Sequence, residues 1–285
     1  GKIRKLAYPR GNLRRVHEIL KFHLKKIEQP DYLLSPRSGR SQRDNAAIHT
    51  SQTQYLTLDI KQFYPSTTYR HIRDWLQGEL GMRDDVAGLL TKLVTVDNIA
   101  SFGSPLTPVL TTLVHRKMFD EIADLCRRRY LRLSLWVDDL TISGRFVPGT
   151  LITQIREIIR KNGLKSHKLS YKNGNRTVFV TGIGIVGSHL VAPRKLHDRI
   201  KNLYTELTET ETVEEFNDIT NKLLSAMGTL RHIVGPNSPT WHRASNRMNT
   251  LRQRRQKKRT LISEMASIST SITEECSGCI DLPWD

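Results

Sequence analysis

The sequence predicts a globular α+β protein, and three observations support this fold class. Residues 130–144 contain two β-prone runs that meet at a pair of aspartates, a pattern typical of an antiparallel hairpin. Residues 12–28 and 150–164 place apolar side chains at helical spacing, which predicts amphipathic helices. From Pro193 onward the pattern is helical and increasingly basic, so we expect a second lobe.

The other elements are shorter. The helix at 150–164 should stop at Asn162 and Gly163, because these residues favour helix C-termini. In chain order, the remaining predicted elements are a polar loop at 33–45, a β-prone run at 55–66 that ends at Pro65, a helix at 67–80 capped by Ser66 or Thr67, a Gly/Pro turn leading into a long helix at 100–129, and a strand at 176–187.

Composition and charge indicate a partner with many negative charges. The 285 residues are 38% hydrophobic, which is enough to bury a core. Lys and Arg number 45 against 28 Asp and Glu, so the formal net charge is +17. Such a surplus repels itself without a polyanion, so we expect nucleic acid, with an anionic membrane as the weaker alternative. No run of 18 apolar residues and no signal pattern occurs, so we expect a cytoplasmic protein with no membrane partner.

The cysteines do not form a recognisable framework. Cys276 and Cys279 have zinc-knuckle spacing, but no second pair of ligands accompanies them. We expect both, and Cys126, to be structural or incidental. The first residue is Gly rather than Met, which leaves open a processed chain or missing upstream sequence.

Three aspartates predict a metal centre. Asp138 and Asp139 interrupt an apolar run, where adjacent carboxylates repel each other and are costly to bury unless a cation lies between them. Asp59 lies in a second apolar strand-like run, so two strands could gather three carboxylates. Such oxygen ligands suit Mg²⁺, and two of these ions would serve phosphoryl transfer. A solvated hairpin turn is the alternative for the Asp pair taken alone.

Ordered segments over nearly the whole chain resemble the reverse transcriptase family. "LDIKQFYPS" resembles its first catalytic-aspartate motif, "FGSPLTPVLTTL" the turn and helix beneath template and nucleotide, and "WVDD" its catalytic hairpin. "NGLKSHK" stands where the family has a Lys-bearing loop, and "TGIGIV" where a strand grips the primer. "NAAIH" at 45–49 and "VTG" at 180–182 match two signatures of retron reverse transcriptases, and "GTLRHIVGPNSP" resembles their thumb.

This resemblance implies a right-hand polymerase with three parts. Residues 1–54 would form partial fingers, and residues 55–192 a palm with an antiparallel sheet, helices and the catalytic aspartates. Residues 193–285 would form a basic, helical thumb.

The resemblance also implies roles for individual residues. Asp59, Asp138 and Asp139 would hold the metals, and Lys168, or alternatively Lys165, would protonate the leaving pyrophosphate. Tyr64 would close on the 2′ position of the sugar and favour dNTPs. Contacts with the incoming nucleotide are expected from Arg4, Tyr64, Phe102, Gly103 and Ser104. Contacts with nucleic acid are expected from Asn45, His49, Trp136, Thr181 and Gly182 and from the basic run Arg252, Arg254, Arg255, Lys257 and Lys258.

Some of these positions depart from the family or have a second interpretation. Phe102 stands where the family has Gln, and Trp136 where it has Tyr, so we expect altered fidelity or substrate preference rather than loss of activity. Asn45 and His49 could equally form a capping or core hydrogen-bond pair. Trp241 and Trp284 could stack on bases, although packing is the expected role.

These features predict an RNA-directed DNA polymerase that uses Mg²⁺ and dNTPs. The retron resemblance implies that it copies part of its own structured noncoding RNA, starting from a 2′-hydroxyl of a guanosine. The product would be a branched, RNA-linked single-stranded DNA (msDNA), made in anti-phage defence with a separate effector protein.

Two alternatives to a retron reverse transcriptase stay open. One is another bacterial reverse transcriptase, either a non-retron defence enzyme or a group II intron relative. An intron relative would be expected to carry a maturase or endonuclease extension. The other is an inactive polymerase that only binds RNA, although the three aspartates argue against it.

Overall fold

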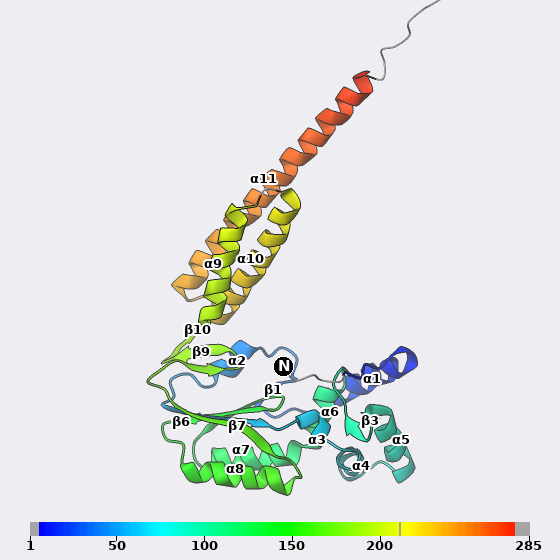
Figure 1. Ribbon diagram of the computed structural model, residues 1–285. Coiled ribbons are helices and arrows are strands. Elements are labelled where there is room, and N and C mark those ends of the chain that lie inside the picture. Colours follow the sequence, from blue (N-terminus) through cyan, green and yellow to red (C-terminus); the bar gives the residue numbers. More distant parts are fainter. Residues whose placement is uncertain (1–5, 211, 277–285) are drawn as a thin grey trace, which may run out of the picture. The chain divides into compact units, whose positions relative to one another are not determined.

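The computed structural model describes residues 6–210 and 212–276, with side chains described as far as residue 258 and at 260 and 261. The chain divides into two compact units, with the boundary between Leu190 and Val191. Figure 1 shows a unit built on β-sheet and a unit of helices. The predicted division into parts ending at residues 54 and 192 is finer than this one and stays a prediction.

A five-stranded sheet organises the first unit (Figure 1). At one edge of the sheet, β1 pairs with its neighbour β5 in parallel. All other neighbouring strands pair antiparallel. The strand order is β1 (Leu33–Ser35), β5 (Arg132–Trp136), β6 (Asp139–Gly144), β2 (Gln54–Ile60) and β7 (Ser166–Asn173). The β5–β6 hairpin that the sequence predicts is therefore present.

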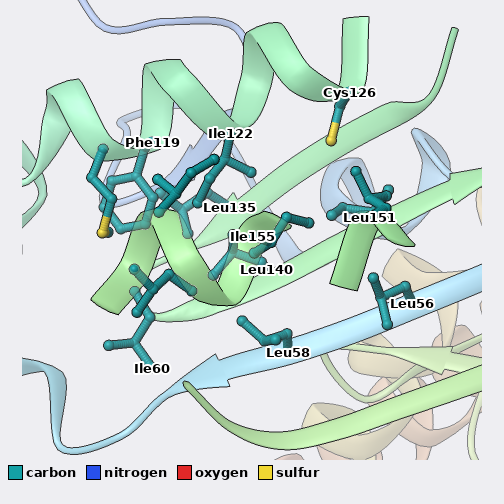
Figure 2. Packing of buried hydrophobic residues seen from close by; sticks show 14 of the residues in the cluster. Leu56, Leu58, Ile60, Phe119, Ile122, Cys126, Leu135, Leu140, Leu151 and Ile155 are labelled. Atoms are coloured by element: carbon teal, nitrogen blue, oxygen red, sulfur yellow. The ribbon is translucent and has the colours of Figure 1, made fainter. Parts of the chain in front are cut away.

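Helices α7 (Arg116–Arg127) and α8 (Gly149–Lys161) cover one face of this sheet (Figure 1). Successive strand residues point to opposite faces, so Leu56, Leu58 and Ile60 of β2 point together into the core that these helices cover (Figure 2). The same alternation directs Asp59 to the other face. The alternating pattern of β2 therefore separates the apolar core from the position of the carboxylate.

A second core forms around shorter helices at the N-terminal end of the same unit. Its buried side chains include Leu24, Ile72, Leu106 and Leu110. The elements here are α1 (Gly11–Leu24), α3 (Phe63–Ser66), α4 (Tyr69–Gly78), α5 (Asp84–Val94), the small hairpin β3 (Thr95–Val96) and β4 (Ile99–Ala100), and α6 (Thr107–Val114).

One short helix and a small sheet complete the first unit. Helix α2 (Gln42–Ala47) contacts β1 and β5 and also β8 and β9, so it touches both sheets. The small sheet has the order β10 (His189–Val191), β9 (Ile183–Val186) and β8 (Val178–Val180). Figure 1 shows α2 and this sheet on the side of the large sheet away from α7 and α8.

The second unit is helical. Helices α9 (Arg194–Thr208) and α11 (Pro239–Cys276) both pack on α10 (Val213–Val234) (Figure 1). Their shared core contains Leu203, Leu223, Met227 and Met248. None of the helices in the described part of the chain is long and apolar enough to cross a membrane.

Several predicted boundaries are wrong for identifiable local reasons. The β-prone run at 55–66 ends at Ile60, because Gln62 adopts a left-handed φ of 50° and Phe63–Ser66 form α3. The cap of α4 is Thr68, whose hydroxyl accepts from His71 N, and not Ser66 or Thr67. The helix predicted to end near residue 129 is divided at His115 into α6 and α7.

Other corrections concern loops and cysteines. The polar loop at 33–45 contains β1 and the start of α2, and α5 was not predicted. The segment expected to be a Lys-bearing loop, residues 162–168, runs into β7, which begins at Ser166 and contains Lys168. Cys126 is buried in the main core, and burial raises the pKa of its thiol to about 12. Cys279 and the side chain of Cys276 lie outside the described residues.

Two buried histidines make the fold sensitive to acid. His49 Nδ1 lies 2.7 Å from Ser143 Oγ, and its Nε2 lies 2.7 Å from Ser134 Oγ. His115 Nε2 lies 3.0 Å from Thr67 Oγ1. Burial lowers the pKa of each imidazole from 6.5 to about 3. Because the folded state favours the neutral ring, this stabilising contribution is complete above pH 6.5 and is lost as the pH falls towards 3.

We expect the free energy of unfolding to fall by up to about 3 kcal/mol between pH 6.5 and 5 from these two groups. His49→Gln should remove about half of that pH dependence, because one of the two buried titrating groups is gone. Urea unfolding at both pH values measures the free energy of unfolding of each protein. The control is His189→Gln, which replaces an exposed histidine. An unchanged pH dependence in His49→Gln would contradict the assignment.

Candidate active site

Three carboxylates meet where β2 pairs with the β5–β6 hairpin. Asp59 of β2 lies opposite Asp139 of β6 in the strand register. Asp138 lies in the turn before β6, where its backbone oxygen accepts from Ile60 N at 3.1 Å. One carboxylate oxygen from each aspartate lies within 4.8 Å of the others. In the described part of the chain, this is the one group of three acidic, His or Cys side chains close enough to share a metal ion.

The turn that carries Asp138 is tight and strained. Trp136 and Asp139 face each other across the hairpin, so the loop has only two residues. Its first residue, Val137, has a φ of 61°, and a positive φ at this position is typical of type II′ turns, which favour Gly. A β-branched residue in this conformation costs about 1–3 kcal/mol. Val137 N donates to Ser35 O of β1 at 2.9 Å, which helps to hold the turn.

The electrostatics of the cluster favour a bound cation. Burial, followed by the charges of Asp59 and Asp139, raises the pKa of Asp138 to about 6. Burial and the charge of Asp59 also raise the pKa of Asp139. Asp59 Oδ1 is buried and has no hydrogen-bond partner among the described residues. A buried, unpaired carboxylate oxygen is costly unless a cation binds it, and three oxygen ligands suit Mg²⁺. The residues therefore fit this metal.

Lys168 reaches the cluster because of an irregularity in β7. Thr57 pairs with Ser170 and Asp59 with His167, so β7 has one extra residue between these pairs, a β-bulge. Lys168 lies in this bulge with a φ of 49°. Its Nζ donates to Asp59 Oδ2 at 3.0 Å, and this hydrogen bond raises the pKa of the ammonium group. The cluster thus contains a lysine that stays protonated near neutral pH.

A cavity of about 790 Å³ opens beside the aspartates. Asp59, Asp138 and Lys168 line it together with Tyr64 and Phe102. Trp136 also lines it. The rings of Tyr64 and Phe102 have centroids 5.2 Å apart, and burial, followed by the charge of Asp138, raises the pKa of the Tyr64 phenol to about 12. The neutral tyrosine and its phenylalanine neighbour form an aromatic wall close to the carboxylates.

The Gly103 turn lies next to this wall but faces other parts of the chain. Gly103 has a φ of 106°, and a Cβ there would lie 3.1 Å from Ala7 O, so both conformation and space favour glycine. Ser104 is buried, 2.7 Å from His17 Nδ1, and its Oγ accepts from Leu106 N. Neither residue lines the cavity, and Arg4 lies outside the described residues. Their contacts with a nucleotide stay predictions.

The two short signatures meet inside the first unit. Asn45 is 1% exposed, and its Nδ2 donates to Thr181 Oγ1 at 3.3 Å. His49 is fully buried between two serines of the β5–β6 hairpin. Gly182, next to Thr181, is exposed. Asn45 and His49 therefore make interior hydrogen bonds, and direct contact of these residues with RNA stays a prediction.

The basic run of α11 points in several directions. Arg255 Nη1 donates to Asn221 Oδ1 of α10 at 2.7 Å, and Lys258 Nζ lies 4.3 Å from the centre of the Phe216 ring. Arg252 and Lys257 are exposed. Arg254 is also exposed and lines a cavity beside α9. Arg255 and Lys258 therefore make contacts within the second unit, and contact of the five predicted residues with nucleic acid stays a prediction.

The structure also adds residues near the aspartates that the sequence patterns did not identify. His167 Nδ1 lies 3.8 Å from Asp59 Oδ2, and Val137 lines the cavity. The only sequence signal for a role of His167 was its position next to Lys168, and that signal was weak. The sequence contains no signal that Val137 would occupy a left-handed turn position.

Comparisons with known proteins give relatives for part of this chain. No protein-family model matches the sequence. The chain is 30% identical over 144 residues to the Retron Se72 reverse transcriptase of Salmonella heidelberg (strain 579083-10), covering 50% of this chain and 38% of that protein. It is 26% identical over 200 residues to the Retron Mx65 reverse transcriptase of Myxococcus xanthus, covering 62% and 46%. Retron reverse transcriptases are therefore homologues of this chain, and the matched part spans less than half of these two relatives.

Solved structures support the fold. The telomerase from Candida albicans, in complex with a TWJ fragment of telomeric RNA, aligns with a TM-score of 0.50 and 10% identity over 85% of this chain and 53% of that chain. The apo telomerase from Candida tropicalis aligns with a TM-score of 0.50 and 9% identity over 77% and 44%. At these identities the likeness concerns the fold alone, and it confirms the predicted polymerase-like fold.

Removing the Lys168 ammonium should tighten divalent-cation binding, because its positive charge competes for Asp59. We expect Lys168→Met to lower the Kd for Mn²⁺ by about three- to ten-fold, since this charge lies against one of the ligands. Titration calorimetry, or the electron paramagnetic resonance signal of free Mn²⁺, measures this Kd. Lys172→Met removes the same charge elsewhere on β7 and should change Kd by less than about two-fold. Unchanged or weaker binding in Lys168→Met would contradict the arrangement.

Proposed function

We propose that this homologue of retron reverse transcriptases is an RNA-directed DNA polymerase. The observation that carries the proposal is the gathering of Asp59, Asp138 and Asp139 beside a cavity that Tyr64 and Lys168 also line. Buried carboxylates that repel one another give no advantage to a protein that only binds RNA, whereas a polymerase needs them as metal ligands. This difference favours an enzyme over an inactive RNA-binding protein.

The residues around the cavity have separate roles in this reaction. Asp59, Asp138 and Asp139 would hold two Mg²⁺ ions. When bound, these ions would activate the attacking 3′ hydroxyl and stabilise negative charge on the phosphates. Lys168, protonated and next to the cluster, would stabilise the leaving pyrophosphate and donate a proton to it. Tyr64, backed by Phe102, would lie against the sugar and exclude a ribonucleotide by steric contact.

The finer part of the proposal concerns the natural template. The similarity to retron reverse transcriptases, together with the contact between Asn45 and Thr181 of the two retron signatures, favours self-primed copying of a cognate structured RNA. The product would be msDNA, made in defence against phage with a separate effector protein. Another bacterial reverse transcriptase activity is the second candidate, because the aspartate cluster fits both.

The first test uses the protein expressed with its native flanking locus. Co-purifying nucleic acid from wild type and Asp138→Ala is separated on a denaturing gel after RNase, DNase or no treatment. We expect a discrete DNA joined to RNA in the wild type and its absence in Asp138→Ala, because a metal ligand is lost. DNA synthesis only after primer, template and dNTPs are added would favour the second candidate. RNA in both samples and no synthesis under either condition would contradict the proposed enzyme.

We further propose that the groove between α9 and α11 binds the RNA backbone. Two cavities of about 440 and 470 Å³ lie there and share Tyr204 and Arg247. Lys201, Arg243 and Arg254 also line them, and no carboxylate does so among the described residues. Cations gathered around a groove without acids suit phosphate contact and strong salt dependence.

Charge-matched variants distinguish the groove from general attraction. Arg247→Gln with Arg254→Gln should weaken binding of the cognate RNA about ten-fold and reduce the salt slope by roughly 1.5, as expected for two lost phosphate contacts. Arg252→Gln with Lys257→Gln removes the same charge from exposed positions outside the groove and should weaken binding by less than about two-fold. Fluorescence anisotropy at several salt concentrations measures both. Equal losses in the two pairs would contradict the groove.

A further inference from the structure

The turn between β8 and β9 has an unfavourable conformation that its sequence does not explain. Val180 pairs with Ile183, so the loop consists of Thr181 and Gly182. Their φ values are 46° and 85°, and positive φ at both residues is typical of a type I′ turn. Gly adopts this conformation without strain, but a β-branched threonine does so at a cost of about 1–3 kcal/mol. Such strain persists only where neighbouring contacts hold it.

Asn45 supplies the contact that holds this threonine. Its Nδ2 donates to Thr181 Oγ1 at 3.3 Å, from a side chain that is 1% exposed. The other atom of the amide, Asn45 Oδ1, is buried and has no hydrogen-bond partner among the described residues. A buried acceptor without a partner costs about 1–3 kcal/mol. Neither Asn45 nor Thr181 is therefore the residue that stability alone would favour at its position.

The helix that carries Asn45 is fixed to the strands of the catalytic hairpin. One turn after Asn45, His49 contacts Ser134 of β5 and Ser143 of β6. Arg132 Nη1 of β5 also donates to Ile48 O at 2.7 Å. Residues 45–49, at the end of α2 and just after it, thus connect the hairpin of Asp138 and Asp139 with the β8–β9 turn.

We propose that Asn45 is a positioning residue that holds Thr181 in its left-handed conformation and so keeps the exposed β8–β9 turn in the form that contacts the primer–template. The inference rests on the proposed polymerase function. Thr181 is partly exposed and Gly182 is exposed, with open space where a Cβ would lie. The tip of the turn is thus accessible to a nucleic acid, while Asn45 acts on it from the interior.

Steady-state extension of a DNA primer on an RNA template tests this role. Asn45→Ala should raise KM for the primer–template about ten-fold and leave KM for dNTP within about two-fold, because the nucleotide cavity does not include the turn. The melting temperature should stay within about 2 °C of wild type, since the variant also removes the unpaired buried oxygen. Asp44→Ala loses the Asp44 carboxylate of the α2 capping box but keeps Asn45, so it should lower the melting temperature without raising KM for the primer–template alone.

A second substitution tests the mechanism. Glycine favours the left-handed conformation without help, so adding Thr181→Gly to Asn45→Ala should return KM for the primer–template to within about three-fold of wild type. Equal increases in both KM values, or failure of Thr181→Gly to restore the double variant, would overturn the inference.

The failure of the enzyme proposal is separable from the failure of this one. If wild type does not extend a primer, the polymerase proposal fails by itself. Amide hydrogen exchange at residues 180–183, in the presence of an RNA–DNA hybrid, then decides the inference. Faster exchange in Asn45→Ala that Thr181→Gly reverses would support it, and equal exchange in all three proteins would overturn it.

Discussion

The pairing of β2 with β6 is the constraint on which the first unit depends. It places Asp59 directly opposite Asp139, so two negative charges are neighbours across a hydrogen-bonded ladder. This repulsion opposes the pairing, and the apolar side chains on the other face of the sheet must offset it. Leu56, Leu58 and Ile60 do so, all at most 3% exposed. A slip of one residue would turn Asp59 into the core, so the apolar pattern also specifies the position of the carboxylate.

Backbone strain in the first unit lies where the surrounding structure can hold it. Val137, Lys168 and Thr181 all have left-handed φ values, and each contacts a different support. Val137 N bonds to β1, Lys168 bonds to Asp59, and Thr181 bonds to Asn45. Strained residues in folded proteins concentrate at functional sites, where a fixed geometry is worth its cost in stability. Val137 and Lys168 lie beside the aspartates, which agrees with a site whose geometry is set before any substrate binds.

The sequence predicted the elements with strong periodicity and missed those decided by single residues. The hairpin of Asp138 and Asp139 and the stop of α8 at Asn162 follow from apolar patterning and turn residues. The early end of β2 does not, because the left-handed Gln62 has no marker in the sequence. The bulge that brings Lys168 to Asp59 depends on pairing between strands 109 residues apart, so no local pattern could reveal it.

The same distinction applies to the roles of candidate residues. Residue type correctly suggested that three aspartates could meet, since carboxylates within apolar runs are unusual. The direction of a side chain is a tertiary property, however. Ser104 is turned towards His17, and Arg255 and Lys258 towards α10, because the packing of α1, α10 and α11 decides those directions. Charge alone therefore does not reveal which basic side chains of α11 also contact α10.

The bulge in β7 has a consequence for solubility. β7 is an edge strand of the large sheet, and a regular, uncharged edge offers unpaired backbone groups to another copy of the same strand. The extra residue interrupts the regular spacing of these groups, and Lys168 and Lys172 add positive charge along the edge. Two such edges would repel each other and fail to match their hydrogen bonds. The irregularity that directs a lysine to the carboxylates thus also protects the sheet against aggregation through its open edge.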